Sequence, residues 1–493
     1  MKKIRMISLL LALLTASSLM SCGSEGKAPE STDAGTTKTD EETTSEYTYP
    51  DENFDGYEFK FYSPDTQFGC YVRMDFEEQS GEQLDDAVYA RNRRIEDRFN
   101  CKIREVQADA STWKTGQEDM CKTISQMVMS GDSDYDAAYL PVYFHPAVAT
   151  EGYLADLRTI PELDFEKPWW DNALNDEMEI AGKLYTASSA LNFMSFDLSW
   201  VLLFNENMME QQGITAPYDT VRDGKWTLDN FNTMLSGVAS LNGDDSFKWN
   251  ADGNAVYGIA NHVTSPSPFL FSAGNRLMTH DGDGFRFTAN TDRMFSTIDK
   301  LITLLDEKSG KAYSESTSGA DFSKRDGYLF AFNYDRALFI SCELKSALEL
   351  RSMESNFGLV PMPKYDENQE DYITYVNPIS CFLTIPTTNP DMKRTGIIID
   401  ALTYDSYKNC LPVYYDVTVS QKGLRNEDSI EMLQIVRNSR STQVMNMYGV
   451  TTDLDNSLHQ IIIKGQTNAA STIASAETKV EANLEKVLSA FGK

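Results

Sequence analysis

Two adjacent tryptophans are the most distinctive chemistry-bearing residues of this 493-residue chain. Trp169 and Trp170 stand in the stretch KPWWDN. An indole offers a flat apolar face and one N–H donor, so an indole pair can stack on the C–H face of a ring-shaped ligand. Because two neighbouring indoles rarely both point into one core, we predict that at least one contacts a ligand. The alternative is one indole in a core and one packed between two parts of the chain.

The histidines and acidic residues limit the catalytic chemistry available to the chain. It has four histidines and 74 acidic residues, with no HExxH zinc motif and no GxSxG nucleophile motif. This disfavours the usual amide and ester hydrolases, whereas a glycosidase needs only two carboxylates and stays possible. The oxygen-rich stretch 250–261 has Ala255 and Asn261 where a calcium loop needs Gly and Glu. We therefore expect no metal and no cofactor.

Six further cysteines follow Cys22, and their spacing fits neither a zinc ribbon nor a redox pair. Six thiols allow 15 full disulfide pairings, and the sequence does not choose among them. Cys101 and Cys381 stand among strand-like residues, so free buried thiols are the favoured interpretation. The six are Cys70, Cys101, Cys121, Cys342, Cys381 and Cys410.

Cys22 itself follows a short apolar run within SSLMSCGSEG. Positive residues at the N-terminus precede the apolar stretch Ile7–Leu14, which is too short to span a bilayer. The order Leu19-Met20-Ser21-Cys22 resembles the bacterial lipobox, whose cysteine is acylated after cleavage. We predict that residues 1–21 are a lipoprotein signal peptide and that Cys22 anchors the chain to the outer face of the bacterial cytoplasmic membrane. The alternative is an ordinary secretion signal that happens to contain a cysteine.

Composition excludes several classes of function. The formal net charge is −30, and loss of the three cations in the leader would make it −33. A nucleic-acid binder needs a basic footprint, so that class is excluded. Residues 24–50 contain no Ile, Leu, Val or Phe, so we expect 22–50 to be a disordered acidic tether.

The remaining chain alternates helix and strand patterns. YEFKF from Tyr57 and CKIREV from Cys101 read as strands, and DAAYLPVYF from Asp136 as a third. Apolar residues at helical spacing precede the second and third strands, which indicates a parallel α/β architecture. Further amphipathic helices are expected over 294–305 and 473–491.

Four stretches, in this order, resemble the extracellular solute-binding proteins of ABC importers, especially the carbohydrate-binding group related to maltose-binding protein. Each is a weak signal alone, and the ordered set behind a lipobox carries the resemblance. The sequence departs from the family at ISCEL (340–344), where Gly-x-Trp is frequent, and at Asn377, where Gly is frequent. The stretches are SGDSDYDAAYLPVYFHPAVATEGYLADL (130–157), GKLYTASSA followed by LLFNENMMEQQGITAPYDTVRDGKWTLDNF (182–231), FGLVPMPKYDE (357–367) and FLTIPTTNPDMKRTGIIIDAL (382–402).

The resemblance implies an α/β, two-lobed periplasmic-binding-protein-like fold of type II, with the lobes joined by a multi-crossover hinge. The first lobe would hold 51–195 plus 340–400, and the second 196–339 plus 401–493. The lobes would close on a ligand by hinge motion.

The resemblance also suggests ligand-binding residues beside Trp169 and Trp170. Tyr143 and Phe144 follow a predicted strand, and the family places cleft residues in the loop after it. Asp197 and Trp200 fall on the expected first hinge crossing, and His262 precedes a Ser/Pro-rich loop. Glu343 and Asn377 stand at the two departures from the family pattern. For each of these residues, ordinary packing is the alternative.

Together these features predict a lipid-anchored solute-binding protein that is not an enzyme. It would capture a small solute, with a carbohydrate favoured, and deliver it to the permease subunits of an ABC transporter. We expect a monomer that binds no nucleic acid. The alternatives are a tethered extracellular carbohydrate-active hydrolase and a ligand sensor of the same fold.

Overall fold

The structure is a computed structural model that describes residues 47–65, 73–110, 112, 114–282, 284–315, 327–419, 424 and 427–492. Within it, Tyr49–Lys493 forms one compact unit. The predicted leader 1–21, the lipidation site Cys22, and Cys70 lie outside the described residues, as does the predicted tether up to residue 46.

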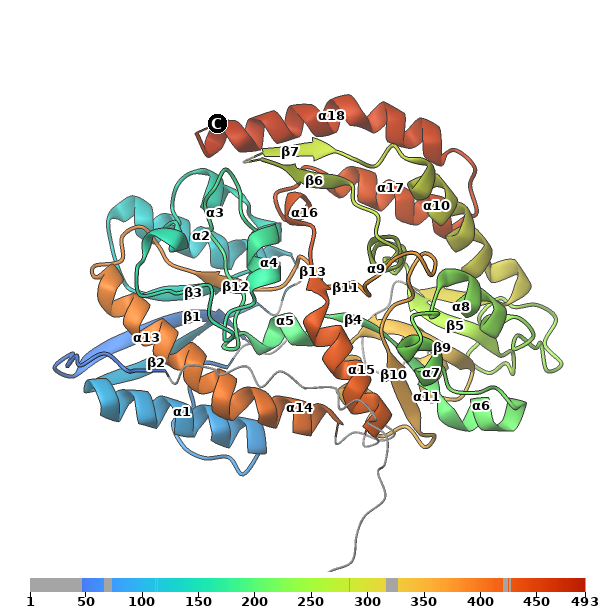
Figure 1. Cartoon of the computed structure of the whole chain (residues 1–493), viewed down its shortest axis with the longest axis horizontal. Coiled ribbons are helices and arrows are strands. Elements are labelled where there is room, and N and C mark those ends of the chain that lie inside the picture. Colours follow the sequence, from blue (N-terminus) through green and yellow to red (C-terminus); the bar gives the residue numbers. More distant parts are fainter. Residues whose placement is uncertain are drawn as a thin grey trace, which may run out of the picture. The chain divides into compact units, whose positions relative to one another are not determined.

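The first lobe is built on a four-stranded sheet in the order β12-β3-β1-β2 (Figure 1). β1 is parallel to both β2 and β3, and β12 is antiparallel to β3. The predicted strand at Tyr57 is confirmed, with Phe59 and Phe61 fully buried. The third strand is shorter than DAAYLPVYF because Pro141 ends it and a 3₁₀ turn follows. The strands are β1 (Tyr57–Pro64), β2 (Cys101–Ala108), β3 (Ala137–Leu140) and β12 (Phe382–Thr384).

Helices pack on this sheet as the sequence pattern predicts. α1 lies between β1 and β2 in sequence, and α2 ends where Gly131 adopts a left-handed φ of 79°. Shorter helices and turns carry the chain toward the second lobe. The elements are α1 (Gln83–Phe99), α2 (Thr115–Ser130), η2 (Val142–Phe144), α3 (Ala147–Thr150), η3 (Leu157–Thr159), α4 (Asn172–Glu177), α5 (Phe193–Asp197), α13 (Met392–Asp405), a π-helix (Ser406–Cys410) and α14 (Leu411–Val419).

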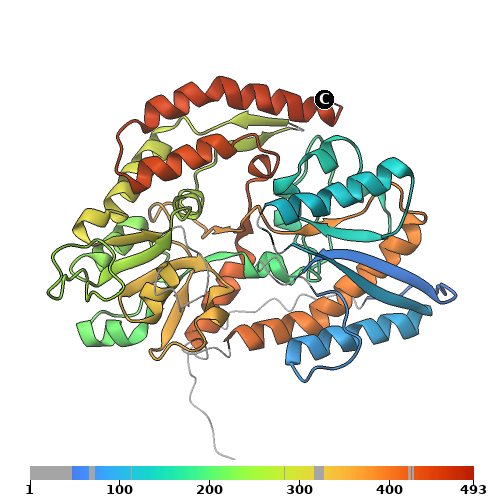
Figure 2. The same cartoon turned by 180° about the vertical axis from the view of Figure 1, so that it is seen from behind.

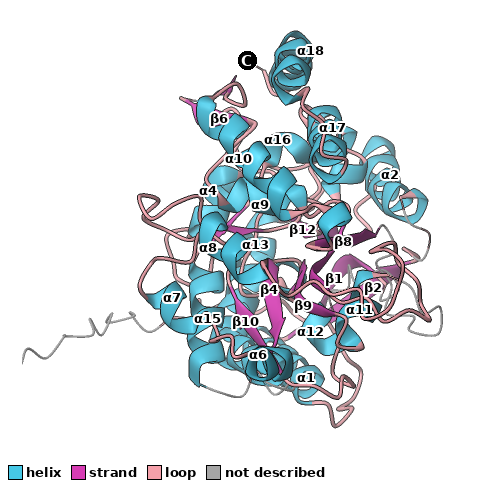
Figure 3. Cartoon of the chain, turned by 90° about the vertical axis from the view of Figure 1, so that its right-hand side faces the viewer, coloured by secondary structure: helices cyan, strands magenta, loops and turns pink. Residues whose placement is uncertain are grey.

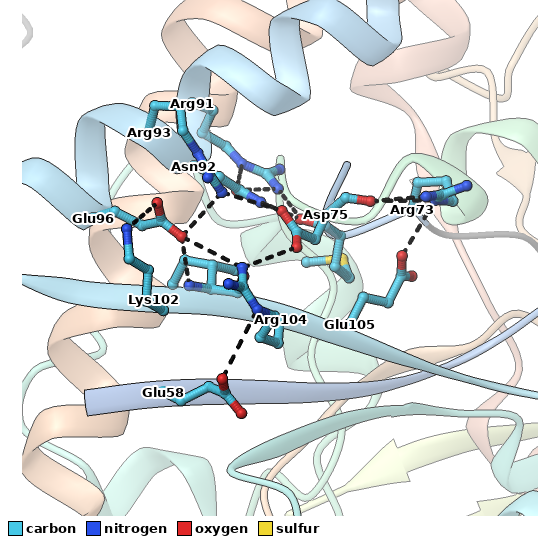
Figure 4. A network of polar contacts seen from close by, with 12 residues as sticks. Glu58, Arg73, Asp75, Arg91, Asn92, Arg93, Glu96, Lys102, Arg104 and Glu105 are labelled. Carbon is cyan, nitrogen blue, oxygen red and sulfur yellow. Dashed lines mark hydrogen bonds and ion pairs between the residues drawn. The ribbon is translucent and has the colours of Figure 1, made fainter. Parts of the chain in front are cut away.

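A buried polar network joins α1 to the outer edge of this sheet (Figure 4). Arg91 is fully buried and donates to the Met74 carbonyl at 2.8 Å, to the Asn92 side chain and to Ser406 Oγ at 3.0 Å. Glu96 accepts the backbone N–H of Ile103 at 2.8 Å. β2 is the edge strand of the sheet. Because Glu96 accepts the Ile103 N–H, that N–H is not available to pair with an additional strand.

The second lobe is built on a five-stranded sheet in the order β10-β4-β9-β5-β8. β5, β8 and β9 are parallel to one another, whereas β4 runs antiparallel to both β9 and β10. A large apolar core covers the sheet, and Trp226 packs within it against Phe231. The strands are β4 (Trp200–Asn205), β5 (Tyr257–His262), β8 (Ala312–Glu315), β9 (Ala337–Glu343) and β10 (Phe357–Val360).

Helices surround the second sheet, and the expected helices over 294–305 and 473–491 are present as α10 and α18. The predicted cap Thr227 begins α8 and accepts the N–H of Asn230 at 3.3 Å. The elements are α6 (Glu206–Gln212), α7 (Tyr218–Arg222), α8 (Leu228–Leu235), α9 (Pro266–Ser272), β6 (Met278–Asp281), β7 (Gly284–Phe287), α10 (Asp292–Leu304), η4 (Glu307–Ser309), α11 (Tyr328–Asn333), α12 (Ser346–Glu349), α15 (Glu427–Asn438), α16 (Val444–Met447), α17 (Thr452–Ile463) and α18 (Ala469–Ala490).

The C-terminal helix α18 joins the two lobes at its end. It packs on α17 and the β6–β7 hairpin (Figures 2 and 3). Just after it, Phe491 stacks on Tyr185 of the first lobe, with ring centroids 4.8 Å apart and an interplanar angle of 27°. The first lobe is therefore held by the last turn of the chain as well as by the hinge.

The chain crosses between the sheets in more than one place. One crossing runs from α5 into β4, and another from β10 through β11 (Thr374–Tyr375) to β12. β11 pairs with β13 (Arg440–Ser441) at the hinge. Residues 340–400 were expected in the first lobe. Instead, both β9 and β10 belong to the sheet of the second lobe. Likewise α14 packs on α1 of the first lobe, although the sequence analysis grouped 401–493 with the second.

The described cysteines are buried, and the thiols of Cys101, Cys121, Cys342 and Cys410 are free. Cys381 is buried as well, so the burial that the strand-like surroundings predicted for Cys101 and Cys381 is confirmed. In the same residues, no helix has the length and apolar character needed to cross a bilayer, and no group of three potential ligands could hold a metal ion.

Candidate functional site

The carboxyl ends of the parallel strands β5 and β9 lie at one edge of the second sheet, beside the start of the antiparallel strand β4. Trp200 begins β4 and pairs directly with Glu343, the last residue of β9. The backbone crossings of the hinge lie against the same point, because Ser199 bridges to Val376 and Leu344 N donates to the Ser199 carbonyl at 2.9 Å. The ends of these strands therefore lie at the hinge between the two lobes.

Glu343 is the centre of a group that we call the hinge cluster: Asp197, Trp200, Glu343, Lys345 and Asn377. The Asn377 amide donates to Glu343 Oε1 at 3.0 Å, and Lys345 Nζ lies 3.2 Å from Glu343 Oε2. The Glu343 side chain is only 15% exposed. A carboxylate that is buried, oriented by an amide and charge-compensated by a lysine is a strong acceptor for hydroxyl donors.

Asp197 also interacts with Lys345. Its Oδ1 accepts the Tyr414 hydroxyl at 2.7 Å, and its carbonyl accepts the Lys345 N–H at 3.1 Å. Burial raises the pKa of Asp197 from 3.8 to about 6, although the Tyr414 hydrogen bond and the Lys345 charge lower it in part. The carboxyl thus sits in a weakly solvated environment at the first crossing.

Trp200 presents an unused donor in this cluster. The residue is 4% exposed, and within the described residues its buried Nε1 has no hydrogen-bond partner. The next cross-strand row on the same face contains Ser341 and Asn261, whose Oγ and Oδ1 are also buried without partners there. Buried polar atoms without protein partners are costly unless water or a ligand satisfies them.

Tyr143 and Phe144 belong to the part of the first lobe that lies near the hinge. They form the η2 turn after β3, which contacts α16 of the C-terminal segment. Burial raises the pKa of Tyr143, the charge of Asp455 adds to the rise, and a hydrogen bond with Thr452 opposes it. Tyr375 lies within electrostatic reach of Tyr143 and of Glu343, and so joins this region to the hinge cluster.

Asp455 of α17 accepts hydrogen bonds from buried donors of α9 and α16, but the arrangement is not that of a nucleophilic triad. It accepts Ser267 Oγ at 2.6 Å and Asn446 Nδ2 at 3.0 Å. His459 uses the same ring nitrogen, Nε2, toward both Ser267 Oγ and Asp455 Oδ1. A triad needs one ring nitrogen for the serine and the other for the acid, so this group is suited to holding structure.

His262 ends β5 beside the hinge cluster. Its Nδ1 lies 2.7 Å from Thr264 Oγ1, and its ring makes an edge contact with Tyr328. Tyr328 in turn lies within electrostatic reach of Glu343. His262 therefore belongs to the edge of the candidate site.

Trp169 and Trp170 are not brought to this cluster. Both indoles are 4% exposed, and both donate through Nε1 to Asp400 Oδ1 of α13, at 2.8 and 3.1 Å. They line a separate pocket of about 200 Å³ together with Phe196, Tyr407 and Arg437. Their role in ligand binding stays a prediction, and this pocket is where it would apply.

Seven of the nine predicted residues thus lie around one junction: Tyr143, Phe144, Asp197, Trp200, His262, Glu343 and Asn377. Sequence analysis missed Lys345, Tyr375 and Tyr414. Lys345 stands two residues after Glu343, a spacing that could have drawn attention to it. Tyr375 and Tyr414 carry no local signal, because only the folded chain brings them to the hinge.

This architecture is the two-lobed α/β fold of the sugar-binding proteins of ABC transporters. No protein-family model and no curated protein matches the sequence. The structure is similar to the GacH receptor of Streptomyces glaucescens, solved unliganded and with acarbose, at TM-score 0.55 and 11% identity, over 87% of this chain and 99% of that one.

Two further structures are similar. One is a cyclo/maltodextrin-binding protein complexed with maltotetraose, at TM-score 0.58 and 12% identity, over 90% of this chain and 99% of that one. The other is the galacto-N-biose/lacto-N-biose I-binding protein of an ABC transporter from Bifidobacterium longum, at TM-score 0.58 and 13% identity, over 88% and 99%. These proteins are binding proteins, and at such identity the likeness establishes the fold.

Proposed function

We propose that this protein captures a carbohydrate between its two lobes and does not alter it chemically. The observation that carries the proposal is the hinge cluster, where Asn377 orients Glu343 and Glu343 pairs across the strands with Trp200, whose buried indole N–H has no partner among the described residues. A sugar hydroxyl can donate to the carboxylate and accept from the indole. The sugar-binding function of proteins with this fold supports the same assignment.

The placement of aromatic side chains supports a sugar rather than a smaller polar solute. Tyr143 and Phe144 stand in the first-lobe turn that contacts α16, and Trp200 begins β4 in the second lobe. Aromatic faces pack against the C–H face of a sugar ring, while buried polar atoms form hydrogen bonds with its hydroxyl groups. A ligand that lacked those hydroxyls would leave the polar atoms unpaired, which costs a few kcal/mol.

A titration with mono- and oligosaccharides tests this proposal. The mature chain carrying Cys22→Ser would be screened by thermal shift and then by calorimetry. A ligand at a hundredfold excess over its Kd should stabilise the fold by about 2.7 kcal/mol. Sugar recovered unchanged after long incubation supports a binder, whereas hydrolysed sugar would assign the protein to the glycosidase class.

Glu343→Gln provides the matched variant. Loss of the charge should weaken sugar binding by at least about tenfold, because hydrogen bonds to charged groups contribute roughly 1.5–3 kcal/mol. Glu58→Gln removes an exposed carboxylate of the first lobe and should leave the Kd unchanged. Equal Kd values for the Glu343→Gln variant and the unaltered chain would reject this cluster as the binding site.

We further propose that Cys22 carries the lipid anchor and that the protein delivers its ligand to permease subunits of an ABC transporter as a monomer on the outer face of the cytoplasmic membrane. The lipobox-like order before Cys22 supports the anchor. Mass spectrometry of the N-terminal peptide should find acyl chains on Cys22, and Cys22→Ser should release the protein from membranes. Failure to co-purify permease subunits with the ligand-loaded protein would favour the sensor alternative.

A further inference from the structure

Glu177, the last residue of α4, lies outside the candidate site but contacts the hinge directly. Its carboxylate accepts Ser441 Oγ at 2.6 and 2.5 Å and the backbone N–H of Thr442 at 2.8 Å. These are the residues at the end of β13 and just after it. A first-lobe helix is thereby fixed to the hinge strand.

The second lobe reaches the same point through Arg276. Its Nη2 donates to Ser441 Oγ at 3.3 Å, and its guanidinium lies 3.5 Å above the ring of Phe271. Burial lowers the pKa of Arg276 to about 10, and burial raises the pKa of Glu177 while the Arg276 charge opposes that rise. Two weakly solvated opposite charges therefore meet on β13, one from each lobe.

A continuous series of hydrogen bonds leads from Glu177 to the hinge cluster. Thr442 Oγ1 donates to the Val376 carbonyl at 3.0 Å, and Val376 N donates to the Ser441 carbonyl at 2.8 Å. The next residue, Asn377, donates its backbone N–H to Leu198 at 3.1 Å and its side-chain amide to Glu343 at 3.0 Å. Displacement of β13 would thus move the amide that orients Glu343.

We propose that Glu177 is a positioning residue for ligand binding, which it serves by holding the hinge strand so that Asn377 stays on Glu343. The inference rests on the proposed function for its binding readout. Glu177 itself contacts no residue of the hinge cluster in the described structure, so its effect passes through β13. Small displacements of binding groups cost affinity steeply, because hydrogen bonds weaken with distance and angle.

Glu177→Ala is the first test, measured by calorimetry with the sugar found in the screen. It should weaken binding by about tenfold, equivalent to one strong hydrogen bond. Glu177→Gln keeps an oxygen that can accept the Thr442 N–H, so it should restore much of the lost affinity. Glu179→Ala removes a nearby carboxylate that pairs with Arg158 instead of the hinge, and it should bind as the unaltered chain does.

A second readout needs no ligand. The indole N–H of Trp200 gives one of six tryptophan side-chain resonances, assigned by its loss in Trp200→Phe. Because Trp200 pairs with Glu343, that resonance should shift in Glu177→Ala and in Thr442→Val, which removes only the Oγ1 donor to Val376. It should not shift in Glu179→Ala.

The two readouts separate this inference from the proposed function. If no sugar binds but the Trp200 resonance shifts as described, the positioning role stands and the proposed ligand fails. An unshifted resonance in both Glu177→Ala and Thr442→Val would overturn the inference. So would equal loss of affinity in Glu177→Ala and Glu179→Ala, since that result would indicate general damage to this part of the first lobe.

Discussion

Two buried polar networks in this protein differ in how many of their buried donors and acceptors have hydrogen-bond partners within the protein. In the α1 network of the first lobe, every side-chain nitrogen of Arg91 and Asn92 has a partner. Among the fully buried side-chain atoms of the charged residues labelled in Figure 4, Arg93 Nε is the one without a partner in the described structure. At the lobe junction, by contrast, Trp200 Nε1, Ser341 Oγ and Asn261 Oδ1 are all buried without partners in the described residues. In a network that stabilises the fold, the polar groups form hydrogen bonds with one another. In a binding site, some donors and acceptors have no protein partner and can bind the ligand.

The largest expected effect comes from breaking the closed network. Arg91→Met would remove the donors to Asn92 Oδ1 and Ser406 Oγ in a buried site, and one of the two donors to the Met74 carbonyl. We expect the free energy of unfolding to fall by about 2–5 kcal/mol, because each buried polar group left without a partner costs about 1–3 kcal/mol. Urea denaturation measures the loss.

Arg104→Met serves as the matched control for that experiment. Its side chain is 43% exposed, so the change should cost under about 1 kcal/mol. If the two variants lost similar amounts of unfolding free energy, the distinction between the buried centre of this network and its partly exposed residues would be wrong.

The carboxyl group of Asp197 should make the stability of the junction depend on pH. Its pKa is raised to about 6, so the folded protein binds this proton more tightly than the unfolded chain does. The contribution is fully present below about pH 4 and is lost as pH rises to about 6. Asp197→Asn keeps an acceptor for Tyr414 and should remove this decline, a difference of roughly 1–2 kcal/mol after allowance for the remaining solvation.

The measurement is urea denaturation of both proteins at several pH values from 4 to 7. The difference between the two curves isolates Asp197 from the other acidic groups that titrate in this range. Parallel curves would show that Asp197 is better solvated than the structure indicates.

Trp200→Phe gives the smallest expected effect and the sharpest test of the open network. The substitution keeps an aromatic ring but removes a donor that has no partner in the part of the chain that the structure describes, so stability should change by less than about 1 kcal/mol. Sugar affinity should fall by roughly fivefold, the value of one ordinary hydrogen bond. A loss of stability without any loss of affinity would mean that Trp200 is simply a packing residue.

Local patterns predicted much of the fold. The strand at Tyr57, the helices containing Met294 and Val480, and the Thr227 cap depend on neighbouring residues, so periodicity and capping chemistry found them. The grouping of segments into lobes was less accurate, since β10 pairs with β4, more than 150 positions away in sequence. Strand pairing of that kind leaves no local pattern.

The candidate site shows the same limit. Glu343 and Asn377 were found because they depart from a family pattern, but the hydrogen bond between them appears only in the folded chain. The tandem tryptophans illustrate the opposite case. Their spacing suggested a ligand surface, yet Asp400, 230 positions beyond Trp170, accepts both indole N–H groups.

The stacking of Phe491 on Tyr185 has a practical consequence for handling this protein. An affinity tag or fluorescent domain fused directly behind Lys493 would crowd an aromatic contact made only two positions earlier, and a truncation at Ala490 would remove it. Purification handles and optical reporters are better introduced between Cys22 and Tyr49, after the proposed cleavage site and ahead of the compact unit.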